Sequence, residues 1–91
     1  MITGIVLIDA VHDRIPEVAS ALAELDGVSE VYSVAGRFDL VAIVRVGHHE
    51  ALAHTVAGLI DKTPGVQETE TLIAFRAYSR HDLEAVFDIG N

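Results

Sequence analysis

The 91-residue chain contains no cysteine and no tryptophan, and its only aromatic residues are two tyrosines and three phenylalanines. Without cysteine there is no disulfide framework and no thiolate metal site, which favours a reducing compartment, with the cytoplasm as the default location. Half of the residues are nevertheless hydrophobic. The interior must therefore be aliphatic, built from Val, Ile, Leu and Ala.

Basic residues are also scarce, with six against fourteen acidic ones and a formal net charge of −8. Such a charge repels a phosphate backbone, so direct nucleic-acid binding is not expected. No apolar run approaches the length that spans a bilayer, and the segment Met1 to Ala10 lacks the basic start of a signal peptide. The composition predicts a soluble protein without a membrane partner.

Two segments, 22–34 and 59–72, follow the same pattern: the end of an amphipathic helix, a glycine turn and an alternating strand. The chain is therefore interpreted as two copies of one strand-helix-strand unit within a single domain, residues 1–91. The predicted strands are 2–9, 28–35, 39–46 and 66–78. The predicted helices begin at Asp13 or Arg14 and at His48 or His49, and a short third helix follows an N-cap at Ser79.

This order predicts an α+β, ferredoxin-like βαββαβ fold with a four-stranded antiparallel sheet and a short C-terminal helix. The first and third strands are apolar on both faces, as expected for the middle of the sheet. Two helices can cover only one face, so we expect a second copy to pack face to face on the other, forming a homodimer. Arg45 is the charged exception, expected to reach a carboxylate or the edge of the sheet.

Three short motifs identify a resemblance to a known family. Gly36-Arg37-Phe38-Asp39 separates the second and third strands, Pro64-Gly65-Val66 leads into the fourth, and Thr69-Glu70-Thr71 alternates along it. In combination, over Ile2 to about Tyr78, they resemble the effector-binding (RAM) domain of Lrp/AsnC feast/famine regulators.

The resemblance implies face-to-face dimers that assemble into octameric or decameric rings and bind free amino acids between dimers. The ligand-binding residues that it implies are Gly36, Arg37, Phe38, Asp39, Thr69 and Thr71. The chemistry suits an amino acid, because the Asp39 carboxylate can hold an ammonium, and turn N–H groups and hydroxyls can hold a carboxylate, with help from Arg37. Each residue also has a plain structural explanation, as a turn residue or a good strand former.

The chain departs from the family pattern in one respect. Typical members have a winged helix-turn-helix before this domain, whereas here the first strand begins at Ile2. A complete, stand-alone member is the expectation. Full-length Lrp/AsnC regulators are then additional candidate partners, through mixed oligomers.

Two alternatives remain open. One is a small dimeric α+β barrel enzyme, such as a cofactor-free oxygenase or a haem-binding relative, which needs a histidine or acid aimed into a cavity. The five histidines all fall on helices, at their ends or in the tail, and no Ser-His-Asp set, metal spacing or cofactor motif is evident. We therefore expect no catalysis, no metal and no cofactor. The other is a pure assembly module that joins dimers through Leu83, Val86 and Phe87.

Overall fold

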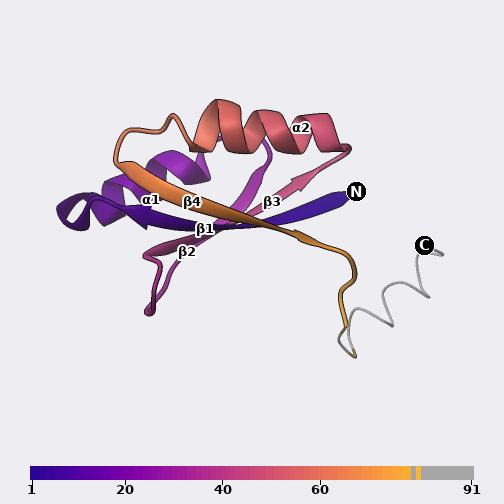
Figure 1. The fold of residues 1–91 in the computed structure, drawn as a ribbon, viewed down its shortest axis with the longest axis horizontal. Helices are drawn as coiled ribbons and strands as arrows, with labels where there is room; N and C mark the ends of the chain where they lie inside the picture. The colour runs from indigo at the N-terminus through magenta and orange to yellow at the C-terminus, as the bar shows by residue number, and fades with distance from the viewer. Residues whose placement is uncertain (79, 81–91) are drawn as a thin grey trace.

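A computed structural model of the chain describes residues 1–78 and residue 80. The elements run in the following order (Figure 1): β1 (Ile2–Ala10), the 3₁₀ turn η1 (His12–Arg14), α1 (Ile15–Ala23), β2 (Val28–Ser33), β3 (Leu40–Val46), α2 (His49–Ala53), η2 (His54–Ile60) and β4 (Val66–Ala74).

The four strands form one antiparallel sheet in the order β2-β3-β1-β4. The two central strands are thus the first and third in sequence, and the ferredoxin-like fold predicted from the sequence is confirmed. Both main helices lie on the same side of this sheet (Figure 1). The molecule has two layers, and the sheet's other face carries no described helix.

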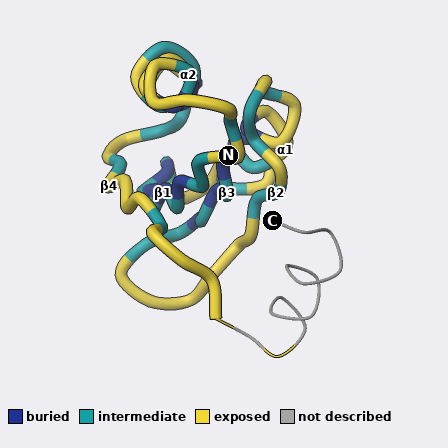
Figure 2. Tube along the Cα trace, turned by 90° about the vertical axis from the view of Figure 1, so that its right-hand side faces the viewer, coloured by how far each residue is buried: buried dark blue, intermediate teal, exposed yellow. Residues whose placement is uncertain are grey.

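The hydrophobic core lies between the helices and the sheet, where Figure 2 shows the buried stretches of β1 and β3. Alternate residues of the central strands point into it, as the two-residue period of a strand requires. The core side chains are Val6, Ile8, Ala10, Val18, Leu22, Leu40, Ala42, Val44, Leu52 and Ile60. All are aliphatic, as the composition predicted.

The second helix changes its winding along its length. After α2, the segment η2 adopts π-helical geometry, and the Asp61 N–H donates to the Val56 carbonyl five residues back at 2.9 Å. The wider turn still buries Thr55 and Ile60, and the Thr55 hydroxyl donates to the Asp26 carbonyl at 3.3 Å. Such π segments often occur at functional sites, which makes this helix a candidate part of the functional site.

The strand boundaries differ from the predicted ones for a simple reason. β4 ends at Ala74, not at Tyr78, because Ala74 pairs with Thr3 and β1 begins one residue earlier, at Ile2. Only Ile2 and Met1 precede Thr3, so the neighbouring strand is too short to pair with a β4 that continues to Tyr78. Likewise β2 ends at Ser33, two residues early, and β3 begins one residue late. The predicted third helix, with Ser79, Leu83, Val86 and Phe87, lies outside the described residues.

Glycine is required where the second repeat turns back into the sheet. Gly65 has φ +95°, and a Cβ on it would collide with a Cγ of the buried Val18. Its carbonyl also accepts the Val11 N–H at 2.8 Å, so the turn is anchored to the end of β1. Gly47 lies in open space, and its φ is not positive.

We expect Gly65→Ala to lower the free energy of unfolding by about 2–4 kcal/mol, from positive-φ strain and overpacking against Val18. Urea denaturation at fixed protein concentration measures the change. The matched variant Gly47→Ala should stay within about 1 kcal/mol of the wild type. Equal losses in both variants would contradict the close approach at Gly65.

Candidate functional site

The sheet face opposite the helices is apolar in its middle. Register pairs Ile5 with Ile43 and Leu7 with Val41, and these four side chains are half-buried although no described element covers them. Tyr32 and Leu72 extend the surface onto the outer strands, where each is about half exposed. We call these six residues the open face. The sequence prediction that the central strands are apolar on both sides is confirmed.

A polar triad borders the open face on β2 and β3. The Tyr32 hydroxyl donates to Glu30 Oε2 at 2.6 Å, and Arg45 Nη1 forms an ion pair with Glu30 Oε1 at 2.9 Å. Arg45 therefore reaches a carboxylate, as expected. The Tyr32 hydrogen bond, followed by the Arg45 one, holds the pKa of Glu30 below its ordinary value, and the same carboxylate raises the pKa of Tyr32.

The turn Gly36–Asp39 projects from the side of the sheet away from the helices (Figure 1). Gly36 has φ +139°, which confirms the need for glycine there. The Arg37 guanidinium lies 5.5 Å from the centre of the Phe38 ring, a cation–π contact. Within the described residues, the N–H groups at positions 36–38 have no hydrogen-bond partner, so they remain available to an anion.

Asp39 already has a structural task. Its Oδ2 accepts the Ala10 N–H at 2.9 Å, and its own N–H donates to the Ile8 carbonyl at 3.0 Å. These bonds satisfy β1 where its register against β4 shifts, between Asp9 and Ala10. Oδ1 has no partner among the described residues, so one carboxylate oxygen remains for a ligand.

The two threonines differ in their surroundings. The Thr69 hydroxyl donates to Asp61 Oδ1 at 2.8 Å, which ties β4 to the end of η2. Thr71 is exposed and lines an apolar pocket instead. Both residues lie opposite buried residues of β1, Ile8 and Val6, and so belong to the helix-facing side of the sheet.

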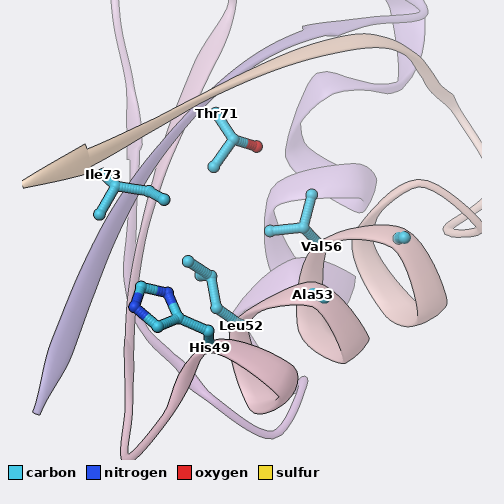
Figure 3. A pocket seen from close by; sticks show the side chains of 7 residues that line it. His49, Leu52, Ala53, Val56, Thr71 and Ile73 are labelled. Atoms are coloured by element: carbon cyan, nitrogen blue, oxygen red, sulfur yellow. The ribbon is translucent and has the colours of Figure 1, made fainter.

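That pocket, of about 280 Å³, lies between the second helix and the edge strand β4 (Figure 3). We call it the α2–β4 pocket. It is lined by His49, Leu52, Ala53, Val56, Ala57, Thr71 and Ile73. Among the described residues, the lining is almost wholly apolar, with the Thr71 hydroxyl and the His49 ring as its only polar side chains, and the volume suits a small apolar group.

One protomer does not unite all of the predicted site residues. The turn Gly36–Asp39 lies on the side away from the helices, whereas Thr69 and Thr71 lie on the helix-facing side, with β1 and β3 between them. The structure therefore places the six residues in two groups. Their role as a ligand site stays a prediction.

Sequence reasoning missed most of the α2–β4 pocket. Of the seven lining residues, only Thr71 was among the predicted ligand-binding residues. A signal was present: Ile73 is an apolar residue on the helix-facing side of an edge strand, where a helix centred over the middle strands leaves it uncovered.

Two histidines make contacts within the second helix. His48 is the N-cap of α2, where its Nδ1 accepts the Ala51 N–H at 3.2 Å, and the His54 ring packs on Gly58. His49 alone borders the pocket, and no acidic residue lines it. Across residues 1–78 and 80, no group of three potential ligands is placed to hold a metal, and no helix is long and apolar enough to cross a membrane.

The fold and the pocket define a small α+β ligand-binding module, and comparison with known proteins gives the family. The model of the Lrp/AsnC ligand binding domain matches residues 3–83. The chain belongs to this family.

Three relatives illustrate the relationship. TTHA0845 from Thermus thermophilus is 50% identical, with a TM-score of 0.81, over 88% of this chain and 100% of that one. The transcriptional regulator FL11 of Pyrococcus horikoshii is 33% identical over 80% of this chain and 48% of its own length. A feast or famine regulatory protein of M. tuberculosis, solved with L-methionine, is 28% identical, with a TM-score of 0.70, over 88% of this chain and 54% of that one.

The chain thus spans at most about half the length of the curated relatives that it matches. Those relatives are transcriptional regulators of the helix-turn-helix type. The shared part is the ligand-binding domain.

The lowered pKa of Glu30 predicts an acid-sensitive contribution to stability. The pKa of Glu30 is lower in the folded state than its ordinary value, which is near 4.5. The ionised carboxylate therefore stabilises the fold when the pH is above that ordinary pKa. This contribution is lost as the pH falls through the lowered pKa. We expect the stability difference between the wild type and Glu30→Gln to narrow as the pH falls below about 4.5 and through the lowered pKa of Glu30. Urea midpoints at constant protein concentration measure it.

Tyr32→Phe is the control, because it removes the largest cause of the shift while keeping the carboxylate. Because the folded-state pKa of Glu30 is then less depressed, the loss of stability in this variant should be smaller and should end at higher pH than in the wild type. A difference between the wild type and Glu30→Gln that stays constant over the whole range would contradict the role of Glu30.

Proposed function

We propose that this domain senses a free amino acid and converts its binding into a change of assembly within a transcription-regulating system. The observation that carries the proposal is the α2–β4 pocket, an apolar hollow with one hydroxyl in a member of a ligand-binding family. Its volume is near the lower limit of about 300 Å³ for ligand pockets, which favours a ligand the size of one amino acid.

The two groups of predicted site residues suit the two ends of such a ligand. The N–H groups of Gly36, Arg37 and Phe38 suit a carboxylate, and the remaining oxygen of Asp39 suits an ammonium. The α2–β4 pocket, beside Thr71, suits an aliphatic or thioether side chain. The methionine bound to the M. tuberculosis relative has this chemistry.

Because the groups lie on opposite sides of one sheet, we propose that the ligand is held between copies of the chain. The turn of one copy supplies the charged groups and the pocket of another supplies the apolar surface. Occupancy then stabilises the assembly over the separated copies, since a ligand favours the state that binds it.

The open face supports a homodimer as the first level of assembly. Its half-buried centre, Ile5, Leu7, Val41 and Ile43, is bordered by the charged pair of Glu30 and Arg45. An apolar centre with a polar rim is the usual anatomy of a protein interface. A two-fold axis in this face would bury the centre against its own copy.

Further parts of the proposal concern partners and location. Face-to-face dimers would join into octameric or decameric rings, and a full-length Lrp/AsnC regulator is a candidate for mixed assembly. The net charge of −8 favours such protein contacts over direct contact with DNA. We propose a cytoplasmic location, in keeping with the regulator relatives and the absence of cysteine.

The proposal is tested by thermal shift and light scattering on the 91-residue chain with each of the twenty amino acids. We expect one or a few aliphatic or thioether amino acids to raise the melting temperature or change the mass. A ligand at 100 times its Kd contributes about 2.7 kcal/mol, which is readily detected. Indifference to all twenty amino acids would overturn the sensor function.

Two substitutions separate the proposed binding role of the Asp39 charge from the structural role of its hydrogen bond to Ala10. We expect Asp39→Asn to keep the Ala10 bond through its amide oxygen, while the loss of the charge weakens binding of a stabilising amino acid at least tenfold. Asp39→Ala should also lower the free energy of unfolding by about 1–2 kcal/mol, because the Ala10 N–H loses its partner. Isothermal titration and urea denaturation distinguish the two effects. Unchanged affinity in Asp39→Asn would remove this carboxylate from the site.

A further inference from the structure

The edge strand β4 and the residues after it hold most of the large apolar side chains that the fold leaves uncovered. Leu72 and Ile73 are 45% and 47% exposed, and beyond the end of the strand Phe75 and Tyr78 reach 95% and 78%. In Figures 1 and 2 this terminal segment leaves the body of the domain. We call residues 75–78 the arm. Two of the five aromatic residues lie in it, so its exposure needs an explanation.

β4 is also an unprotected edge. It has nine residues, pairs only with β1, and has no described neighbour on its other side. Edges of this length are templates for another strand unless charges or cover block them. The charges here, Glu68 and Glu70, lie within the first five residues of β4, while the last four include Leu72 and Ile73.

We propose that two copies of the chain pair through β4 and the arm, antiparallel, about a two-fold axis at Ile73. Directly opposed residues then have numbers that sum to 146, so each residue faces one of the same parity. From Glu68 to Ala74, odd residues of β4 face the helices and even residues face the open side, in both copies. Every side chain thus meets a neighbour on its own side of a continuous sheet.

The register is favoured by charge. Glu70 lies opposite the partner's Arg76, and the two-fold axis repeats this pair. On the same side Leu72 lies opposite the partner's Ala74, and Glu68 opposite the partner's Tyr78. Opposite charges directly across an antiparallel pair stabilise it. Moving the axis by one residue, to Ala74, would place Arg76 opposite Leu72, so the pair of opposite charges would be lost.

The pairing also completes the α2–β4 pocket. The partner's Phe75 lies opposite Thr71, on the helix-facing side, where it covers the side of the pocket that the sheet edge leaves uncovered. Its ring supplies the aromatic wall that the seven lining residues lack. This last step rests on the proposed sensor function, whereas the strand pairing stands without it.

The open face remains available in this arrangement, because β4 pairs through its edge and not through its face. Each copy then has two different two-fold contacts, one through the open face and one through β4. Two such contacts connect dimers in series and permit a closed ring.

Single-cysteine variants test the axis, since the natural chain has no cysteine. Residues opposed in an antiparallel pair have Cα atoms about 4.5–5.5 Å apart, within disulfide range. We expect Ile73→Cys to form a covalent dimer in most chains under mild oxidation, without any amino acid added. The matched variant Gln67→Cys, roughly 20 Å from the axis along the same strand, should stay monomeric on non-reducing gels.

A charge reversal supplies the second measurement. We expect Glu70→Arg and Arg76→Glu each to weaken the association through β4 about tenfold in analytical ultracentrifugation, and the double variant to recover to within about threefold of the wild type.

The pairing is overturned if Ile73→Cys crosslinks no better than Gln67→Cys while Ile43→Cys, on the open face, crosslinks readily. A double charge variant as weak as its parents would also overturn it. Neither result depends on an amino-acid response, so failure of the pairing is distinguishable from failure of the sensor function.

Discussion

The structure depends on one imbalance: the central strands are apolar on both faces, but both helices cover the same one. The covered face forms an aliphatic core in which every second residue of β1 and β3 is buried. The other face presents Ile5, Leu7, Val41 and Ile43 with no described cover. A sheet of this kind is stable as a two-layer unit and still carries a driving force for association. The strands that make the core thus also supply the apolar surface of the proposed homodimer.

In the edge strand β4, alternate residues point to opposite faces of the sheet and so have different surroundings. Its helix-facing residues, Thr71 and Ile73, border the α2–β4 pocket, and its open-side residues alternate between charge and apolar surface. Core, pocket and contact surfaces therefore share the same strands. A ligand in this pocket lies within one residue of the surface through which we propose that copies associate, which offers a short physical route from binding to assembly.

Asp39 illustrates how a residue proposed to bind a ligand can also have a structural task. Its carboxylate supports β1 at the register shift through Ala10, and this bond holds the remaining oxygen in place. A rigid carboxylate loses little freedom on binding an ammonium, so the structural bond favours the proposed role. The pattern of glycine, aromatic and aspartate in the turn is explained equally by both tasks.

The sequence by itself determined the fold class, the core pattern and the doubly apolar central strands, because these follow from local periodicity. It also indicated that Arg45 reaches a carboxylate or the edge of the sheet, from the cost of an unpaired charge, but it did not identify Glu30 as the partner. It also determined the family, through three short motifs. It could not determine where β4 ends, since Ala74 is the last residue with a full neighbour in β1.

Nor could it locate the α2–β4 pocket. Leu52 and Ile73 are far apart in sequence, and the hollow between them depends on where the second helix lies over the sheet. Likewise, only the tertiary structure placed the turn Gly36–Asp39 and Thr71 on opposite sides of the sheet. Periodicity assigns a side chain to a face, but the distance between two faces is set by the packing of whole elements, which no local pattern contains.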